Sequence, residues 1–391
     1  MVDSFVEDRR QLIAGNRVRL LRDGAQIFPA WLEAIEAARS RISLEMYIFA
    51  DDGIGRRVAE ALCRAAERGV AVRVLYDDVG CRLTPRAFFE AMRARGVMTI
   101  AYHRNRRFLP RVWKMFRRNH RKNLVIDQQT GFVGGLNISN AWVPATEGGD
   151  AWRDAVVEVR GPGAQALEAA FAETWNPRAR RSARLPVGPV PGPASAALAA
   201  PGGGTGAAAG ATALAVVTNS ERGARFAIRR SILHALRASR RRIWLANPYF
   251  VPDRGFSLEL ERAAARGTDV RILVPARSDS NILDAAAHAT FPRLLGAGVH
   301  IWRSPSVIHT KAIAVDDVFV SLGSYNLDHR SLAYNLEIVV NVIDEDFNRR
   351  VAEMLASEMF SSVEVTRQAL AEEPLLARIG DRLAYGLRRW L

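Results

Sequence analysis

The feature of this 391-residue sequence that most constrains its fold is a long spaced motif that occurs twice. Both copies fit the pattern H-x-K-x4-D-x6-G-[GS]-x-N without a gap. The first copy contains His120, Lys122, Asp127, Gly134, Gly135 and Asn137, and the second contains His309, Lys311, Asp316, Gly323, Ser324 and Asn326. Two matches to so long a pattern indicate a duplicated structural unit.

Lysine is rare in this chain, and its positions are informative. Only three of the 55 basic residues are lysines. Two of them, Lys122 and Lys311, occupy the same position of the two motif copies, and the third is Lys114. A compact ammonium and a planar guanidinium are not interchangeable at a specific site. The motif lysines are therefore candidates for a chemical role.

The two halves of the chain resemble each other outside the motif as well. Residues 38–44, ARSRISL, recur as residues 239–245, SRRRIWL. Residues 67–75, ERGVAVRVL, recur as residues 265–273, ARGTDVRIL. The shared order of these segments and of the motifs indicates an internal duplication with one copy per domain.

A segment rich in Ala, Gly and Pro separates the halves. Residues 185–220 contain no charged side chain. Ala, Gly and Pro bury little apolar surface, and Gly and Pro also break helices. We read them as a flexible linker rather than a membrane-spanning helix. The expected domains are then residues 1–184 and residues 221–391, each with one motif copy.

The hydrophobic pattern within each half alternates between two periods. Short runs rich in Val, Ile and Leu, such as residues 72–75 and 270–274, are typical of strands. Between such runs lie helical patterns, over residues 54–68, 84–95, 223–238, 256–266 and 281–296. The alternation predicts an α/β sandwich with a mixed sheet in each half.

Composition limits the partners and the compartment. A net charge of +14 and a pI near 10.7 favour an anionic partner, such as nucleic acid, an acidic membrane surface or a phosphorylated substrate. The alternative is that the excess of positive charge only reflects a genome that favours arginine codons. The two cysteines, Cys63 and Cys81, form no disulfide framework or metal cluster, which fits a reducing compartment. We expect no signal peptide, no membrane span, no metal and no cofactor.

The motif side chains suit chemistry on a phosphodiester. Such a site must neutralise the anionic oxygens, supply a nucleophile and protonate the leaving alkoxide. Lys122, Lys311, Asn137 and Asn326 are candidates to bind the oxygens. His120 and His309 are candidates for the nucleophile and the general acid, because imidazole titrates near neutral pH.

Further residues are candidates to support this chemistry. Asp154 and Glu337 hold equivalent places in the two halves, and a carboxylate that accepts the far ring N–H of each histidine fixes its tautomer. Gly135 and Ser324 allow backbone N–H groups to approach a phosphate closely.

Each residue taken alone also has an ordinary structural explanation. A single His or Lys beside a strand is usually a surface or core residue, and an Asn is often a turn residue. The aspartates Asp127 and Asp316 end predicted strands, so they either join the catalytic group or only anchor the motif. Duplication with identical spacing is what favours the functional interpretation.

Both motif copies resemble the HKD motifs of the phospholipase D superfamily. The resemblance implies two α/β sandwich domains that pack about a pseudo-twofold axis and share one active site. It also implies a covalent phosphohistidine, with His120 as the nucleophile and His309 as the acid and base. The order of the two histidines is a habit of the family, since the symmetry of the site hides it in the sequence.

Other segments resemble bacterial cardiolipin synthases. They are residues 45–49, EMYIF, residues 247–252, NPYFVP, and residues 323–331, GSYNLDHRS, which precede Asn335-Leu336-Glu337. That subgroup joins two phosphatidylglycerols into cardiolipin and releases glycerol. Better-known members begin with two transmembrane helices, so the chain is similar to the shorter members. The resemblance implies an anionic phospholipid substrate.

Two segments are candidates for peripheral membrane contact. Residues 104–122 contain nine basic residues and no acid, and their apolar residues fall on one face of a helix that starts near Pro110. Trp113, Phe116, Arg117 and Arg118 are its contact candidates; a helix packed on the domain explains the same stripe. The second candidate is the C-terminal segment, with packing between the halves as its alternative; its apolar residues are Leu375, Leu376, Ile379, Leu383, Leu387 and Trp390.

The sequence predicts a phosphatidyltransferase at the cytoplasmic face of the cell membrane, with no nucleic acid partner. A hydrolytic phospholipase D is one alternative. It would differ only in that water, rather than an alcohol, attacks the phosphohistidine. A nuclease with the same motif is a second alternative. A groove that binds nucleic acid more often carries single, spaced aromatic residues on which bases stack, whereas the aromatic residues here belong to a continuous apolar stripe. A lipid-binding scaffold requires degenerate motifs, and neither copy is degenerate. Donor, acceptor and oligomeric state stay open.

Overall fold

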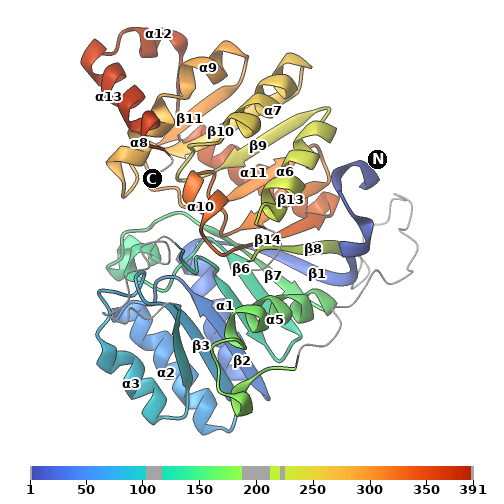
Figure 1. Ribbon diagram of the computed structural model, residues 1–391, viewed down its shortest axis with the longest axis vertical. Helices are drawn as coiled ribbons and strands as arrows, with labels where there is room; N and C mark the ends of the chain where they lie inside the picture. The colour runs from blue at the N-terminus through green and yellow to red at the C-terminus, as the bar shows by residue number, and fades with distance from the viewer. Residues whose placement is uncertain (1, 103–116, 187–211, 221–224, 389–391) are drawn as a thin grey trace.

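The two halves form one continuous sheet in a computed structural model that describes residues 2–102, 117–186, 212–220 and 225–388 (Figure 1). The described strands follow the order β15-β11-β10-β9-β12-β13-β14-β8-β1-β7-β6-β5-β2-β3-β4. The order outward from β1 repeats the order outward from β8, with β7 matching β14 and β5 matching β12. This repetition confirms the predicted duplication and α/β class.

The strands of the N-terminal half are β1 (Ile13–Arg22), β2 (Arg41–Met46), β3 (Ala71–Asp77), β4 (Met98–Tyr102), β5 (Asn123–Ile126), β6 (Thr130–Gly134) and β7 (Ala155–Arg160). Those of the C-terminal half are β8 (Thr212–Asn219), β9 (Arg242–Ala246), β10 (Asp269–Pro275), β11 (His300–Ser304), β12 (Ala312–Val315), β13 (Phe319–Gly323), β14 (Glu337–Ile343) and β15 (Val363–Glu364). Strands β2, β3 and β4 are parallel, whereas β5, β6 and β7 pair antiparallel, so the sheet is mixed.

The helices of the N-terminal half are α1 (Asp23–Ala37), α2 (Gly53–Glu67), α3 (Arg86–Ala94) and α5 (Pro162–Trp175). Those of the C-terminal half are α6 (Ala227–Ala238), α7 (Arg254–Ala265), α8 (Asn281–His288), α9 (Phe291–Gly296), α10 (His329–Ala333), α11 (Glu345–Phe360), α12 (Arg367–Ala371) and α13 (Leu375–Gly386). Short 3-10 helices include η3 (Asn140–Trp142) and η4 (Ala145–Glu147). No helix in the described ranges is long and apolar enough to cross a membrane.

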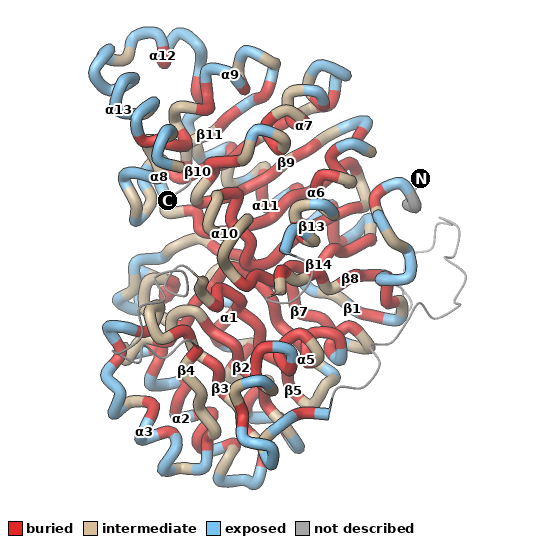
Figure 2. Tube along the Cα trace, in the orientation of Figure 1, coloured by how far each residue is buried: buried red, intermediate tan, exposed pale blue. Residues whose placement is uncertain are grey.

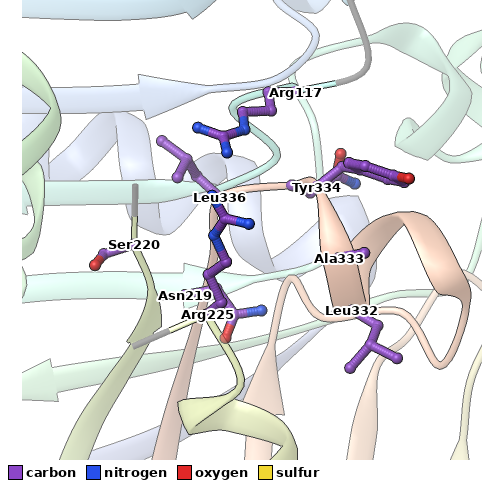
Figure 3. A pocket seen from close by; sticks show the side chains of 9 residues that line it. Arg117, Asn219, Ser220, Arg225, Leu332, Ala333, Tyr334 and Leu336 are labelled. Carbon is purple, nitrogen blue, oxygen red and sulfur yellow. The ribbon is translucent and has the colours of Figure 1, made fainter. Parts of the chain in front are cut away.

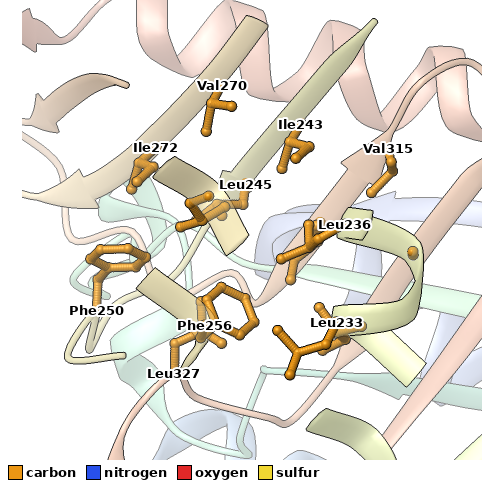
Figure 4. Packing of buried hydrophobic residues seen from close by; sticks show 14 of the residues in the cluster. Leu233, Leu236, Ile243, Leu245, Phe250, Phe256, Val270, Ile272, Val315 and Leu327 are labelled. Atoms are coloured by element: carbon orange, nitrogen blue, oxygen red, sulfur yellow. The ribbon is translucent and has the colours of Figure 1, made fainter. Parts of the chain in front are cut away.

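Helices cover both faces of each half of the sheet, as in a sandwich. Helices α6, α7 and α9 pack on one face of the C-terminal half, where Leu236, Leu245 and Phe256 meet in the core (Figure 4). Helix α11 packs on the other face, and α5 does the same in the N-terminal half. The strands are buried along most of their length (Figure 2), because apolar side chains on both faces are covered.

A shared core joins the halves. One apolar cluster contains side chains from both, including Val157 of the N-terminal half and Leu214, Leu322 and Val340 of the C-terminal half. Strands β1 and β8 pair directly at Ile13 with Leu214. This core fixes the halves against each other and so allows one site to be built from both.

Two sequence expectations differ from the structure. Residues 212–219 belong to strand β8, so the linker prediction over residues 185–220 is wrong for this stretch. The run TALAVVTN is small and uncharged because it is buried between β1 and β14. The single helix expected over residues 281–296 is two helices, α8 and α9, since Pro292 opens a new helix instead of continuing the first.

Candidate active site

The two motif histidines are anchored by the opposite halves of the chain. The backbone N–H of His120 donates to the carbonyl of Leu336 at 3.0 Å, and that of His309 donates to the carbonyl of Arg153 at 2.7 Å. Each partner residue directly precedes a candidate orienting carboxylate, Glu337 or Asp154. The backbone of one half therefore positions the histidine of the other.

The side chains repeat this crossed arrangement. Nδ1 of His120 lies 3.0 Å from Oε1 of Glu337, and Nδ1 of His309 lies 2.7 Å from Oδ2 of Asp154. All four side chains are buried. With Nδ1–H donated to a carboxylate, each ring directs Nε2 toward a reacting group, and Nε2 of His309 also lies 3.1 Å from Nζ of Lys311.

Burial lowers the pKa of both histidines below its usual value. Burial lowers the pKa of His120 to about 4, against the opposing effect of Glu337. Burial also lowers the pKa of His309, and the charges of Lys311 and Lys122 and of His120 act in the same direction. The effect of His120 on the pKa of His309 indicates that the two rings belong to one electrostatic site.

The two carboxylates differ in their surroundings. Burial raises the pKa of Asp154 to about 7. Burial alone also raises the pKa of Glu337, but His120, Lys122 and the Ser324 hydroxyl lower it overall. Glu337 accepts hydrogen bonds from Ser331 Oγ at 2.7 Å and Ser324 Oγ at 2.5 Å in addition to the histidine. The pseudo-symmetric site is therefore electrostatically asymmetric.

Both motif lysines are buried beside the histidines. Nζ of Lys122 donates to the carbonyl of His120 at 2.9 Å and lies 5.1 Å from the ring centre of Tyr47. Nζ of Lys311 donates to the carbonyl of His309 at 2.5 Å. Burial lowers the pKa of Lys122, and the charge of Lys311 lowers it further; burial lowers the pKa of Lys311 to about 8. Two repelling ammonium groups in a buried site favour an anionic ligand between them.

The other candidate phosphate ligands are placed unevenly. The side-chain Oδ1 of Asn137 accepts the N–H of Ile48 at 3.1 Å, which leaves its amide N–H groups for a ligand. Asn326 is buried, and its Oδ1 has no hydrogen-bond partner within the described part of the chain.

The role expected for Ser324 does not match its contacts, whereas that of Gly135 stays a prediction. The backbone N–H of Ser324 donates to the carbonyl of Ile338 at 2.8 Å, and its hydroxyl donates to Glu337, so both groups are already used. A Cβ atom at Gly135 would lie 2.5 Å from Oδ1 of Asp154. Glycine is required there because the Asp154 carboxylate fills the space of a side chain. The contact of the Gly135 backbone N–H with a phosphate stays a prediction.

The catalytic expectation for Asp127 and Asp316 is also corrected. Each follows its strand at the end opposite to the histidine. Asp127 accepts from the backbone N–H groups of residues 39, 40 and 41, and Asp316 accepts from those of residues 240, 241 and 242. These carboxylates fix the starts of β2 and β9, because buried backbone donors need acceptors.

Comparison with known proteins agrees with this geometry. A family model described as "Cardiolipin synthase, PLD-like domain" matches residues 31–175 and 232–359. The chain is 34% identical over 377 residues to cardiolipin synthase A of Pseudomonas entomophila, covering 96% of this chain and 75% of that relative, and 35% identical to the Pseudomonas putida (strain W619) protein with the same coverage. The chain belongs to the cardiolipin synthase family of phospholipase D-like proteins.

Membership confirms the predicted family and the enzyme class, a phospholipase D-type phosphatidyltransferase. Among solved structures, the fold is similar to that of phosphatidylserine synthase from Haemophilus influenzae Rd KW20, with a TM-score of 0.69 at 14% identity, covering 99% of this chain and 96% of that one. It is also similar to polyphosphate kinase from Porphyromonas gingivalis, with a TM-score of 0.54, covering 87% of this chain and 50% of that one. These likenesses concern the fold alone.

Aromatic residues that the sequence did not single out surround the histidines of this family member. The ring of Tyr47 lies 4.8 Å from that of His120. The ring of His309 lies 5.1 Å from Trp142, 5.8 Å from Trp152 and 6.4 Å from Tyr249. Trp142 also donates from Nε1 to Oδ2 of Asp154 at 3.1 Å. Tyr47 and Tyr249 lie in the segments 45–49 and 247–252 that resemble cardiolipin synthases, which was the available signal.

The predicted membrane-contact residues lie partly within the described chain. Trp113 and Phe116 fall outside the described residues. Arg118 accepts from the N–H of Leu336 through its carbonyl. Arg117 lines a pocket where the halves meet, together with Arg225 and the segment before Glu337 (Figure 3). Their membrane contact stays a prediction.

Proposed function

We propose that this chain is a cardiolipin synthase that transfers the phosphatidyl group of one phosphatidylglycerol to another and releases glycerol. The observation that carries the proposal is the crossed pair of buried histidines, each with Nδ1 on a carboxylate of the other half. Such a pair supplies one nucleophile and one proton carrier to the same phosphorus. Family membership supports the choice of lipid substrate.

In the first step, Nε2 of His120 attacks the phosphorus of the donor lipid and forms a P–N bond. The bond from phosphorus to the glycerol oxygen breaks, and His309, protonated at both ring nitrogens once the anionic lipid is bound, donates its Nε2 proton to that oxygen. Glu337 stabilises the positive charge that develops on the His120 ring. Lys122, Lys311 and Asn137 bind the non-bridging oxygens, whose negative charge increases during attack.

In the second step, the acceptor hydroxyl attacks the phosphohistidine. His309, now neutral at Nε2, removes the hydroxyl proton, and the P–N bond breaks to return the electron pair to His120. Asp154 holds the ring of His309 through both steps. Product identity depends on which hydroxyl reaches the phosphorus, since water at this point gives phosphatidic acid instead.

We also propose that the enzyme is attached peripherally to the cytoplasmic face of the cell membrane and has no nucleic acid partner. The substrate carries its acyl chains in the bilayer, which supports attachment at the surface. Cys63 and Cys81 are both free and buried, which fits the reducing side of that membrane.

The test is product analysis with purified protein and phosphatidylglycerol in mixed micelles. We expect cardiolipin and glycerol in equal molar amounts, and neither product with His120→Ala. Phosphatidic acid as the main lipid product would instead identify a hydrolase. Cleavage of DNA that is lost in His120→Ala, with no lipid turnover, would overturn the proposal.

A further inference from the structure

Helix α13 turns its apolar face away from the protein. Its five large apolar side chains have exposed fractions between 43% and 82%; they are Leu375, Leu376, Ile379, Leu383 and Leu387. At 3.6 residues per turn they fall within an arc of about 120°. Figure 2 shows the helix largely in the colour of exposed residues. An exposed apolar stripe of this width marks an interaction surface.

The opposite face of α13 is fixed to α8, so the exposure is a property of the fold. Ala384 is buried and Tyr385 packs against the C-terminal core. Oδ2 of Asp381 lies 2.7 Å from Nδ1 of His288, and Oε1 of Glu373 lies 3.3 Å from Nε2 of the same ring. These polar contacts hold the helix with its leucines outward. Among the described residues, α13 packs on α8 of its own half and not between the halves, which was the alternative for this segment; Trp390 lies outside the described residues.

Charge selects the kind of partner. Arg378 and Arg382 are exposed and lie along one border of the apolar arc. The only acid of the helix, Asp381, is turned toward His288. A second copy of the chain packed on this face would bring the same arginines toward each other in a symmetric interface. An anionic lipid surface meets both the leucines and the arginines favourably.

The position of α13 connects this face to the candidate active site. Asp279, just before α8, accepts the hydroxyl of Tyr249 at 2.5 Å, and the ring of Tyr249 lies 6.4 Å from that of His309. Helix α13 therefore packs on the helix that begins two residues after Asp279, which contacts the wall of the site. A lipid whose chains stay in the bilayer needs the site close to the surface that the protein contacts.

We propose that α13 docks on an anionic lipid bilayer, with its five apolar side chains at the level of the acyl chains and Arg378 and Arg382 at the lipid phosphates. This proposal depends on the proposed function in one respect, namely that the substrate is a lipid held in a membrane. The docking surface itself follows from the exposed stripe, its arginine border and its attachment to α8.

The experiment is sedimentation of the full chain with vesicles of phosphatidylglycerol and phosphatidylcholine, and with vesicles of phosphatidylcholine alone. The double variant Leu376→Asp, Leu383→Asp replaces two exposed leucines of α13. The matched control is Phe226→Asp, which replaces an apolar side chain of 50% exposure at the start of α6. Figure 1 places α6 on the side of the C-terminal half away from α13.

We expect the double variant to bind the anionic vesicles at least about tenfold more weakly than wild type. Phe226→Asp should bind like wild type, and pure phosphatidylcholine should bind the wild type weakly. Equal sedimentation of the double variant and wild type on anionic vesicles would overturn the proposal. So would light scattering that shows a wild-type dimer and a monomeric double variant, because the face would then be a protein interface.

Activity in detergent mixed micelles separates this proposal from the proposed function. The double variant should keep the wild-type rate there, since micelles present the lipid without a bilayer. Loss of lipid transfer by the wild type in micelles would refute the proposed function and leave vesicle binding as a separate result. A double variant that binds vesicles normally yet loses activity in micelles would contradict α13 docking.

Discussion

Nδ1 of His120 lies 3.0 Å from Oε1 of Glu337, a carboxylate 217 positions later in the chain and in the other half of the duplication. Asp154 has the reciprocal contact with His309. Neither half alone holds a histidine together with its orienting carboxylate. The site is therefore a property of the packed pair, and removal of either carboxylate should affect the histidine of the opposite half.

The first prediction concerns this crossing. Glu337→Gln and Asp154→Asn should each lower kcat by at least about a hundredfold, because an amide neither stabilises an imidazolium nor fixes its tautomer. In 15N spectra of histidine-labelled protein, Glu337→Gln should shift the ring nitrogens of His120, and Asp154→Asn those of His309. The reverse pattern of shifts would contradict the crossed arrangement.

The second prediction concerns the motif lysines. Lys122→Arg and Lys311→Arg should each lose about a hundredfold or more in kcat, since a planar guanidinium does not fit the space of a buried ammonium that stabilises transition-state charge. Lys114→Arg is the matched control and should keep the wild-type rate; Lys114 lies outside the described residues. Wild-type rates in either motif variant would show that only the positive charge matters.

The third prediction concerns Trp142, whose N–H donates to Asp154. This donor helps to lower a carboxyl pKa that burial raises to about 7, so its loss in Trp142→Phe should raise the pKa further. Activity that needs the ionised carboxylate should then fall at neutral pH and recover as the pH rises. The expected measurement is an acid limb of kcat/KM displaced to higher pH.

Trp31→Phe is the control for the indole N–H, because Nε1 of Trp31 is buried without a partner among the described residues. It should leave the pH profile where it is, whatever its effect on stability. An unchanged acid limb in Trp142→Phe would mean that this hydrogen bond does not tune Asp154.

The fourth prediction separates anchoring from catalysis. Asp127→Asn should lower the free energy of unfolding by about 1–3 kcal/mol, because it weakens hydrogen bonds to the backbone at the start of β2. The kcat of the folded fraction should stay within about threefold of wild type, against the hundredfold effects expected for catalytic groups. A large loss of kcat without loss of stability would restore a catalytic role.

The pH dependence of stability gives a second view of Asp127. Burial alone raises the pKa of Asp127, but the N–H of Arg41 and donors from Ser40 and Arg39 lower it overall from 3.8. Its stabilisation is thus present above the unfolded value and is lost as pH falls through the folded pKa. Denaturant titrations of wild type and Asp127→Asn should therefore converge in strong acid.

The fold was predictable because the duplication presents each element twice. The similar segments 67–75 and 265–273, for example, predict the same strand in both halves. Strand β8 was hidden because its alanines resemble the preceding Ala- and Gly-rich segment, and only pairing with β1 and β14 shows that they are buried. The break between α8 and α9 at Pro292 was missed because the apolar pattern continues through it.

The site residues were predictable as a set, but several contacts were not. Spacing does not say which carboxylate serves which histidine, since the crossing arises from packing between the halves. The backbone N–H of Ser324 was expected to approach a phosphate, but it donates to Ile338 and the hydroxyl donates to Glu337, because only the folded chain brings β13 and β14 side by side there. Trp142 belongs to no repeated motif or hydrophobic pattern in the sequence. Its role is evident only from its contact with Asp154 in the folded chain.

The central claim is that one half supplies a nucleophile, His120, to a site whose proton carrier, His309, comes from the other. The most direct measurement is mass spectrometry of the wild-type protein after brief incubation with phosphatidylglycerol and a denaturing quench. The account predicts an acid-labile phosphatidyl group on His120, and none on the His120→Ala variant. A phosphatidyl group on any other residue, or turnover without a covalent intermediate, would contradict it.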